Sequence, residues 1–162
     1  YMSFGFLTTL IFMSGFLSGL ILWLVIPTST SWNIIKVPYL ITFSLFILHR
    51  VEEKVMNFFP ALANITGVET PEILSLEVIL LVFSSVGAWL LIPHLIKRNY
   101  SFGYFLAWTF FAAMGVTELA HFIFPLFTGE RYGYFPGMAS VILLAPAAWW
   151  GIYRLTWKNT AV

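Results

Sequence analysis

The chain has 162 residues, of which 60% are hydrophobic and 9% are charged, and its formal net charge is +1. An ordinary soluble domain has about 25% charged residues, so this composition indicates an integral membrane protein. The small net charge and the lack of a basic stripe argue against a nucleic-acid partner. The sequence contains no cysteine, which excludes disulfides, thiolate metal sites and cysteine nucleophiles.

Apolar stretches of membrane length follow one another along nearly the whole chain. A helix that crosses a bilayer needs about 20 predominantly apolar residues. The sequence predicts five such helices, and therefore an all-α, polytopic membrane helix bundle that forms a single domain over residues 1–162. The predicted spans cover residues 4–26, 34–56, 72–96, 102–124 and 136–154, and we expect a polar loop at residues 64–67.

The first predicted span carries small residues on one side. Gly15 and Gly19 are four residues apart, and Ser14 and Ser18 precede them at the same spacing. Small residues at this spacing let a second helix approach closely. We therefore expect this side of the span to serve packing rather than chemistry.

The second predicted span carries a cluster of ionisable residues in its second half. His49, Glu52 and Glu53 stand at positions i, i+3 and i+4, so in a helix one imidazole and two carboxylates share a face. The chain has only seven acidic residues, so this cluster indicates a functional polar site. The alternative is an interfacial cluster neutralised by Arg50 and Lys54, but these side chains project about 100° away from His49 and Glu53 respectively.

The fourth predicted span carries a second carboxylate and imidazole. Glu118 and His121 are three residues apart and share a helix face. The alternative is that they form a hydrogen-bonded pair that only fixes helix packing. Glu77, near the start of the third span, either joins the same site or simply faces the positive end of its own helix dipole.

The basic residues predict the orientation of the spans. With five spans, one side of the membrane carries Lys36, Lys97, Arg98, Arg154 and Lys158, and on the other side Arg50, Lys54 and Arg131 are mixed with acidic residues. The positive-inside tendency then predicts a cytoplasmic C-terminus and an outer N-terminus. The second and fourth spans run in the same direction, and at about 1.5 Å per residue both motifs lie about 21–24 Å along their helices. The two motifs can therefore meet at one depth.

The same topology sorts the remaining candidates. The third span runs the opposite way, which brings Glu77 near the depth of the motifs and carries His94 to the opposite membrane face. The fifth span begins on the side of the motifs. We therefore expect Tyr134, Pro136 and Gly137 to form the rim of the site.

A bound metal ion would explain why these ionisable residues lie together. Charged groups at membrane depth cost about 2.5–3.5 kcal/mol each unless they are paired or solvated. Histidine nitrogens and carboxylates suit zinc, iron or manganese, and Glu-x-x-His is the ligand spacing of di-iron carboxylate bundles. The predicted ligands of this transition metal are His49, Glu52, Glu118 and His121. Glu53 and Glu77 are candidates for a further ligand or for the catalytic general base.

The motifs also resemble a known family. The stretch Leu48-His49-Arg50-Val51-Glu52-Glu53 resembles the motif of the HXXEE-motif family, a family of small bacterial and archaeal membrane proteins of unknown function. The resemblance spans about residues 40 to 150 and also rests on Phe59-Pro60, His121 and Tyr134-Phe135-Pro136-Gly137. It implies a common His/Glu site in a prokaryotic cell membrane and supplies no reaction. The family often has Asn about four residues before the later histidine, whereas Thr117-Glu118 stand here.

Three classes of function fit these residues. The first is a metal-dependent membrane enzyme that acts on a lipid or another hydrophobic small molecule, by hydrolysis or, with iron, by oxygen activation. The second is a metal-free lipid isomerase in which buried Glu and His side chains exchange protons. The third is a non-catalytic protein, either an accessory subunit of a membrane complex, with homo-oligomers possible, or a proton or cation pathway. Few polar residues continue through the second span, which counts against a pathway.

Overall fold

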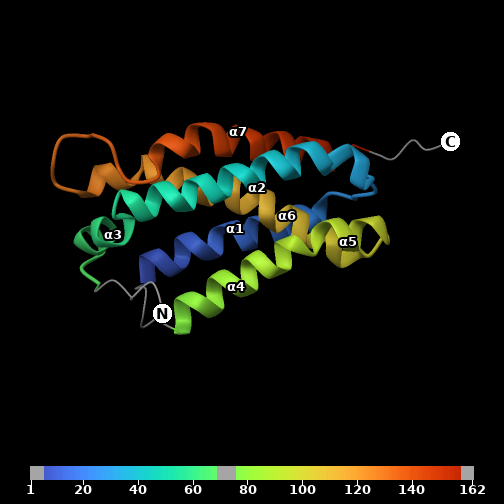
Figure 1. Cartoon of the computed structure of the whole chain (residues 1–162), viewed down its shortest axis with the longest axis horizontal. Helices are drawn as coiled ribbons and strands as arrows, with labels where there is room; N and C mark the ends of the chain where they lie inside the picture. The colour runs from blue at the N-terminus through green and yellow to red at the C-terminus, as the bar shows by residue number, and fades with distance from the viewer. Residues whose placement is uncertain (1–5, 69–75, 158–162) are drawn as a thin grey trace.

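The computed structural model describes residues 6–68 and 76–157, without the side chains of residues 7, 8, 12, 77 and 78. In this part the chain forms helices and no strand, so the prediction of an all-α fold is confirmed. The α-helices are α1 (Phe6–Val25), α2 (Trp32–Val55), α3 (Phe58–Thr66), α4 (Leu76–Leu90), α5 (Ile92–Lys97), α6 (Ser101–Gly115) and α7 (Met138–Leu155). Two 3-10 helices, η1 (Thr117–Phe122) and η2 (Phe124–Phe127), follow α6, and Figure 1 shows how the long helices assemble into a bundle.

Four helical segments of the described chain are long and apolar enough to cross a membrane. They are Trp32–Val55, Ile79–Lys97, Ser101–Phe127 and Met138–Leu155, and they correspond to the last four predicted spans. The first predicted span corresponds to α1, whose apolar stretch Thr9–Val25 is shorter than these four. The predicted starts of the first and third spans, at residues 4 and 72, lie outside the described residues.

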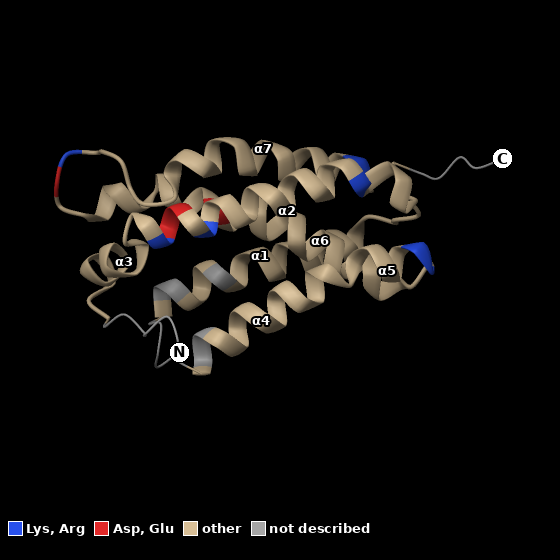
Figure 2. Cartoon of the chain, in the orientation of Figure 1, with Lys and Arg blue, Asp and Glu red and all other residues tan. Residues whose placement is uncertain are grey.

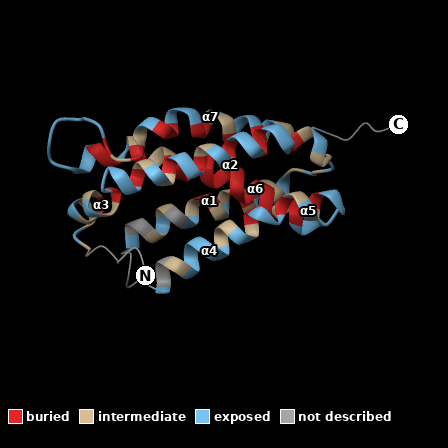
Figure 3. Cartoon of the chain, viewed as in Figure 1, coloured by how far each residue is buried: buried red, intermediate tan, exposed pale blue. Residues whose placement is uncertain are grey.

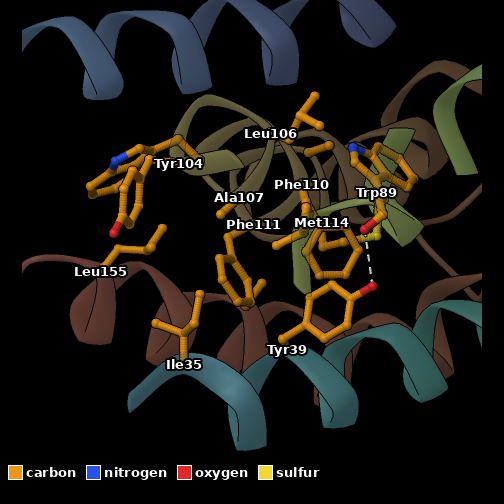
Figure 4. Packing of buried hydrophobic residues seen from close by; sticks show 14 of the residues in the cluster. Ile35, Tyr39, Trp89, Tyr104, Leu106, Ala107, Phe110, Phe111, Met114 and Leu155 are labelled. Carbon is orange, nitrogen blue, oxygen red and sulfur yellow. Dashed lines mark hydrogen bonds between the residues drawn. The ribbon is translucent and has the colours of Figure 1, made fainter. Parts of the chain in front are cut away.

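Helix α6 lies at the centre of the bundle, where it contacts α1, α5 and α7, while α2 packs along α7. Figure 3 shows that the buried residues concentrate along the middle of the bundle. Aromatic side chains join the helices there. The Tyr39 hydroxyl donates to the carbonyl oxygen of Trp89 at 3.0 Å, and the Phe110 ring lies 5.4 Å from Tyr39 and 5.3 Å from Trp89 (Figure 4). The core therefore ties α2 and α4 to α6.

Helix α3 replaces the polar loop expected at residues 64–67. Asn57 adopts the left-handed conformation at φ 57° after α2, and the chain then turns directly into α3. Gly67, at φ 66°, ends this helix. Phe58 and Leu62 are buried on one side of α3, so apolar contact stabilises a helix that its polar residues did not predict.

The fourth predicted span is not one continuous α-helix. Helix α6 ends at Gly115, a poor helix former that is followed by two β-branched residues, and the chain continues as η1 and η2. The Trp149 Nε1 donates to the Gly115 carbonyl oxygen at 2.7 Å, which satisfies an acceptor near the end of α6. Residues i and i+3 of a 3-10 helix are eclipsed, so Glu118 and His121 point in the same direction from η1.

The described acidic side chains lie at one end of the bundle, whereas basic residues lie at both ends. Figure 2 shows acidic and basic residues together at the α3 end, and basic residues alone at the opposite end, near α5 and the end of α7. Four of the five basic residues that the sequence placed on one side are described, and Lys158 lies outside the described residues. Which end faces the cytoplasm stays a prediction.

Two buried glycines let α1 approach α6 closely. A Cβ atom built on Gly19 would lie 2.7 Å from the backbone nitrogen of Thr109, and one built on Gly15 would lie 2.7 Å from the Cα atom of Ala113. There is no room for a side chain at either position. The small residues of α1 therefore serve helix packing, as their spacing indicated.

We expect Gly19→Ala to lower the melting temperature of the purified protein in detergent. The added methyl group overlaps the backbone of α6, and overpacking of this kind costs about 1–3 kcal/mol. Gly87→Ala is the matched control, because nothing lies within 4 Å of a Cβ atom at that position of α4. The control should keep or slightly raise the melting temperature. Equal melting temperatures for Gly19→Ala and the unchanged protein would contradict the close contact of α1 with α6.

Candidate metal centre

Four buried side chains from α2 and η1 form one polar group. His49 and Glu53 lie one turn apart on α2, and Glu118 and His121 face them from η1. Each residue offers one ligand atom, and these atoms all lie within 4.8 Å of one another. The bundle thus brings the two motifs together in its interior, as their similar predicted depths in the membrane allowed.

The imidazoles and carboxylates of this group alternate around a ring. His49 Nε2 lies 3.4 Å from Glu53 Oε1 and 3.1 Å from Glu118 Oε2. His121 Nε2 lies 3.4 Å and 3.3 Å from the same two oxygen atoms. A tetrahedral ion bound at about 2.0–2.1 Å holds neighbouring ligand atoms about 3.3–3.4 Å apart. The four N···O separations are therefore close to those between metal ligands, and the N···N and O···O separations are within 4.8 Å.

Hydrogen bonds on the outer ring nitrogens determine which imidazole atoms face the group. His121 Nδ1 lies 2.6 Å from the carbonyl oxygen of Pro136, which can only accept, so Nδ1 carries a proton. His49 Nδ1 lies 2.8 Å from Ser140 Oγ. The Ser140 hydroxyl itself donates to the Gly137 carbonyl oxygen at 3.1 Å, so His49 Nδ1 donates to Ser140. In both neutral imidazoles, Nε2 is consequently an unprotonated acceptor that points into the group.

Four acceptor atoms that face one another require positive charge between them. The lone pairs of the two Nε2 atoms and of the two carboxylate oxygens share one small volume, where they repel. Either a metal ion or protons on the imidazoles can remove this repulsion. The geometry therefore allows two kinds of chemistry, at a metal centre or by proton exchange between carboxylates and imidazoles.

Arg50 pairs with both carboxylates of the group from the side away from the imidazoles. Its Nη1 lies 2.7 Å from Glu53 Oε2, and its Nη2 lies 2.7 Å from Glu118 Oε1. Each carboxylate thus gives one oxygen to Arg50 and presents the other to the imidazoles. Arg50 leaves α2 about 100° away from His49, as expected, but the length of its side chain lets it reach Glu53, three residues along α2. Two carboxylates and one guanidinium leave one negative charge uncompensated.

Glu52, a predicted ligand, lies outside the group. Its Oε1 accepts hydrogen bonds from the Tyr134 hydroxyl at 2.6 Å and from the Ala139 backbone nitrogen at 3.1 Å. Its Oε2 accepts one from the Ser140 backbone nitrogen at 2.7 Å. Glu52 therefore binds the first turn of α7, where free N–H groups carry partial positive charge. Adjacent residues diverge by about 100° around a helix, so Glu53 takes the place that we had expected for Glu52.

The predicted rim residues lie beside the imidazoles and Glu52. Gly137 has φ 97°, and a Cβ atom built on it would lie 2.5 Å from His121 Nδ1 and 2.9 Å from His49 Cε1. Pro136 supplies the carbonyl group that binds His121, and Tyr134 binds Glu52. The segment that leads into α7 therefore positions both imidazoles.

Two further candidates are Glu77 and His94. Glu77 belongs to α4, but its side chain lies outside the described residues. His94 is exposed on α5, at the opposite end of the bundle from α3 (Figure 1). Sequence reasoning missed Ser140 as the partner of His49, and the only available signal was its position, three residues after Gly137 at the start of the last span.

We expect Gly137→Ala to displace the imidazoles and to weaken metal binding by at least tenfold. The methyl group would overlap both rings, and a residue with a side chain is strained at φ 97°. The measurement is metal content per chain after dialysis against a graded chelator. Gly133→Ala is the control, because the nearest atom to a Cβ there is the Arg131 carbonyl oxygen at 3.6 Å. Equal metal retention by both variants would contradict this role of Gly137.

Tyr134 lies in the chain between the membrane-length segments Ser101–Phe127 and Met138–Leu155, and ionisation of its phenol depends on pH. Partial burial, together with the hydrogen bond to the Glu52 carboxylate and its charge, raises the pKa of Tyr134 from 10.0 to about 12. The protonated phenol therefore contributes stability that is fully present below pH 10 and is lost as the pH rises through about 12. We expect Glu52→Gln to lower the Tyr134 pKa, measured by NMR titration of 13Cζ-labelled tyrosine. Tyr134→Phe identifies the resonance, and an unshifted titration in Glu52→Gln would contradict the contact.

Comparison of the chain with protein-family models, with curated proteins and with solved structures gave no match. The resemblance to the HXXEE-motif family therefore rests on the motif residues alone. The function is therefore inferred from the geometry of His49, Glu53, Glu118 and His121.

Proposed function

We propose that this protein is a membrane metalloenzyme that acts on a lipid or another hydrophobic substrate. Its transition metal, zinc, iron or manganese, binds to His49, Glu53, Glu118 and His121. The observation that carries this proposal is the ring of four acceptor atoms, with N···O separations of 3.1 to 3.4 Å, in the interior of an apolar bundle. The proposed site belongs to the class of His/Glu sites that the HXXEE-motif resemblance implies.

The surroundings of the four ligands support a metal. Metal-binding histidines usually donate their second ring N–H to a carbonyl group, a carboxylate or water, and His121 donates to the Pro136 carbonyl oxygen. The carboxylates are in turn held by Arg50, which orients one oxygen of each toward the ligand atoms of the imidazoles. Two nitrogen and two oxygen donors suit zinc, iron and manganese.

The proposed topology has five spans, with α1 as the first and the C-terminus in the cytoplasm. Contact of α1 with α6, a helix of a membrane-length segment, supports its place within the membrane. The α5 end carries basic residues and no described acidic side chain, whereas the α3 end carries both, and this difference supports the orientation (Figure 2). This topology places the candidate metal centre toward the non-cytoplasmic side.

The reaction class follows from what such a metal supplies. A bound transition metal polarises a carbonyl oxygen or lowers the pKa of a bound water molecule, which favours hydrolysis. The chain itself buries the four ligands and excludes bulk water. Arg50 neutralises the outer oxygens of Glu53 and Glu118, so that one oxygen of each remains available.

A metal-free acid–base isomerase is the second candidate. One specific observation favours it: His49 Nε2 and Glu118 Oε2 are 3.1 Å apart, within hydrogen-bonding distance, so they can share a proton. A protonated imidazole would also compensate the negative charge that Arg50 leaves. A non-catalytic accessory subunit is the third class, and it would need neither a metal nor a titrating pair.

Metal analysis of ligand variants tests the proposal. We expect the purified protein to contain about one transition metal ion per chain, because the site presents four donor atoms. Glu53→Gln should lower metal affinity by at least tenfold, since it replaces a ligand. Glu130→Gln is the matched control: it undergoes the same chemical change, but the residue is exposed in the loop before α7, lies outside the group of four and should keep the metal. Elemental mass spectrometry after chelator dialysis gives the measurement.

Two results would contradict the metal centre. The first is a protein that binds none of zinc, iron(II) and manganese(II) after incubation with each ion. The second is equal metal retention by Glu53→Gln and the unchanged protein. After the first result, the acid–base isomerase and the accessory subunit remain as candidate functions. The effect of Glu53→Gln on lipid turnover then distinguishes between these two candidates.

A further inference from the structure

An apolar cavity of about 110 Å³ adjoins the candidate metal centre. Its walls come from α1, α2, α3, α4, α6 and η1 and include the rings of Phe46 and Trp89 and the side chain of Met114. Arg50 and Glu118 also line it, and both belong to the polar group around the candidate centre. Part of the lining is therefore charged, and most of the remainder is aliphatic and aromatic.

A smaller cavity of about 20 Å³ lies against the polar group itself. Glu53 and His121 line it, and it shares Arg50, Thr117 and Glu118 with the apolar cavity. A cavity needs about 10–15 Å³ to hold a water molecule, so this one accommodates one water-sized group. The two cavities together offer a small space of mixed polar and apolar lining beside the proposed metal and an apolar space next to it.

The apolar cavity is accessible from the side of the bundle. Leu81 and Val82 of α4 line it, and they are 40% and 45% exposed. Both belong to the membrane-length segment Ile79–Lys97. A molecule that is dissolved in the membrane can therefore reach the cavity laterally, past α4.

We propose that this cavity binds a membrane-dissolved amphiphile whose aliphatic chain ends in an oxygen acceptor, as in a fatty acyl ester and in the fatty acid that its hydrolysis releases. The inference rests on the proposed function and names its substrate class. An apolar cavity of about 150 Å³ holds one benzene molecule, so a cavity of about 110 Å³ holds only a short part of a chain. The first carbons of the chain lie between Phe46, Trp89 and Met114, and the rest leaves past Leu81 and Val82.

Arg50 is the residue that binds the oxygen-bearing end of the proposed amphiphile. Its two Nη atoms bind Glu53 and Glu118, but its Nε is buried without a hydrogen-bond partner among the described residues. A buried donor without an acceptor is unfavourable, and a substrate oxygen near the guanidinium can satisfy it. The guanidinium carbon also lies 5.2 Å from the ring centroid of Phe46, which lines the cavity. The polar end of the amphiphile therefore lies at Arg50 and its chain lies along Phe46.

Adjacent serines of α4 provide a matched pair of variants. Ser85 lines the cavity, whereas Ser84 is exposed and donates to the Leu81 carbonyl oxygen of its own helix at 3.2 Å. Ser85→Phe places a ring in the cavity, and Ser84→Phe places the same ring on the outer side of the helix. Val82→Trp, at the exposed mouth, is a second blocking variant should Ser85→Phe fail to fold.

The probe is a C16 fatty acid with a photoreactive diazirine near the carboxyl end, added to the protein in phosphatidylcholine nanodiscs. After illumination, mass spectrometry locates the labelled residues. We expect labelling of the cavity residues in the unchanged protein and in Ser84→Phe, and at least fivefold lower labelling in Ser85→Phe. A probe of the same length without the carboxyl group should label the cavity several-fold less.

Equal cavity labelling of Ser84→Phe and Ser85→Phe would overturn the proposal, as would labelling spread evenly over the exposed faces of the helices. Equal labelling by the probe without a carboxyl group would overturn the assignment of the oxygen-bearing end. Metal content, measured on the same samples, separates the two proposals. If the protein contains metal but the cavity is not labelled, only the proposed amphiphile site is contradicted. If the cavity is labelled but the protein contains no metal, only the proposed metal centre is contradicted.

Discussion

Two imidazole nitrogens and two carboxylate oxygens face one another inside an apolar helix bundle, and this arrangement needs positive charge at its centre. Each imidazole donates its outer N–H to a group at the start of α7, so neither can turn its proton inward while it stays neutral. Arg50 occupies only the far oxygens of the two carboxylates. The inner oxygens and the two Nε2 atoms are thus left for a cation or for protons.

The start of α7 holds this arrangement in place, although it contributes none of the four ligands. Glu52 binds the backbone of its first turn, Ser140 accepts from His49, and the Pro136 carbonyl accepts from His121. Gly137 allows the backbone to pass so close to both rings. The adjacent Glu52 and Glu53 thus have separate roles, because Glu52 anchors α7 to α2 and Glu53 faces the imidazoles.

Much of this structure was predictable because the bilayer restricts the possible folds. Hydropathy alone predicted an all-α bundle, and the distance along each helix predicted that the two motifs meet at one depth. Finer features depend on contacts that spacing does not report. Burial of Phe58 and Leu62 stabilises α3 as a helix. The rotation of about 100° between adjacent helical residues places Glu53, and not Glu52, in the polar group. Ser140 joins the site only through the packing of α2 on α7.

Arg50 connects the polar group with the apolar cavity. Its guanidinium binds two carboxylates and also lies over Phe46, so one side chain contacts both the charged group and the cavity wall. Only arginine combines a planar fork for two carboxylates with stacking on an aromatic ring, and lysine does not reproduce both. The position of the proposed chain and the charge of the candidate metal centre therefore depend on the same residue. This coupling provides a physical reason for a substrate with its oxygen-bearing end at Arg50.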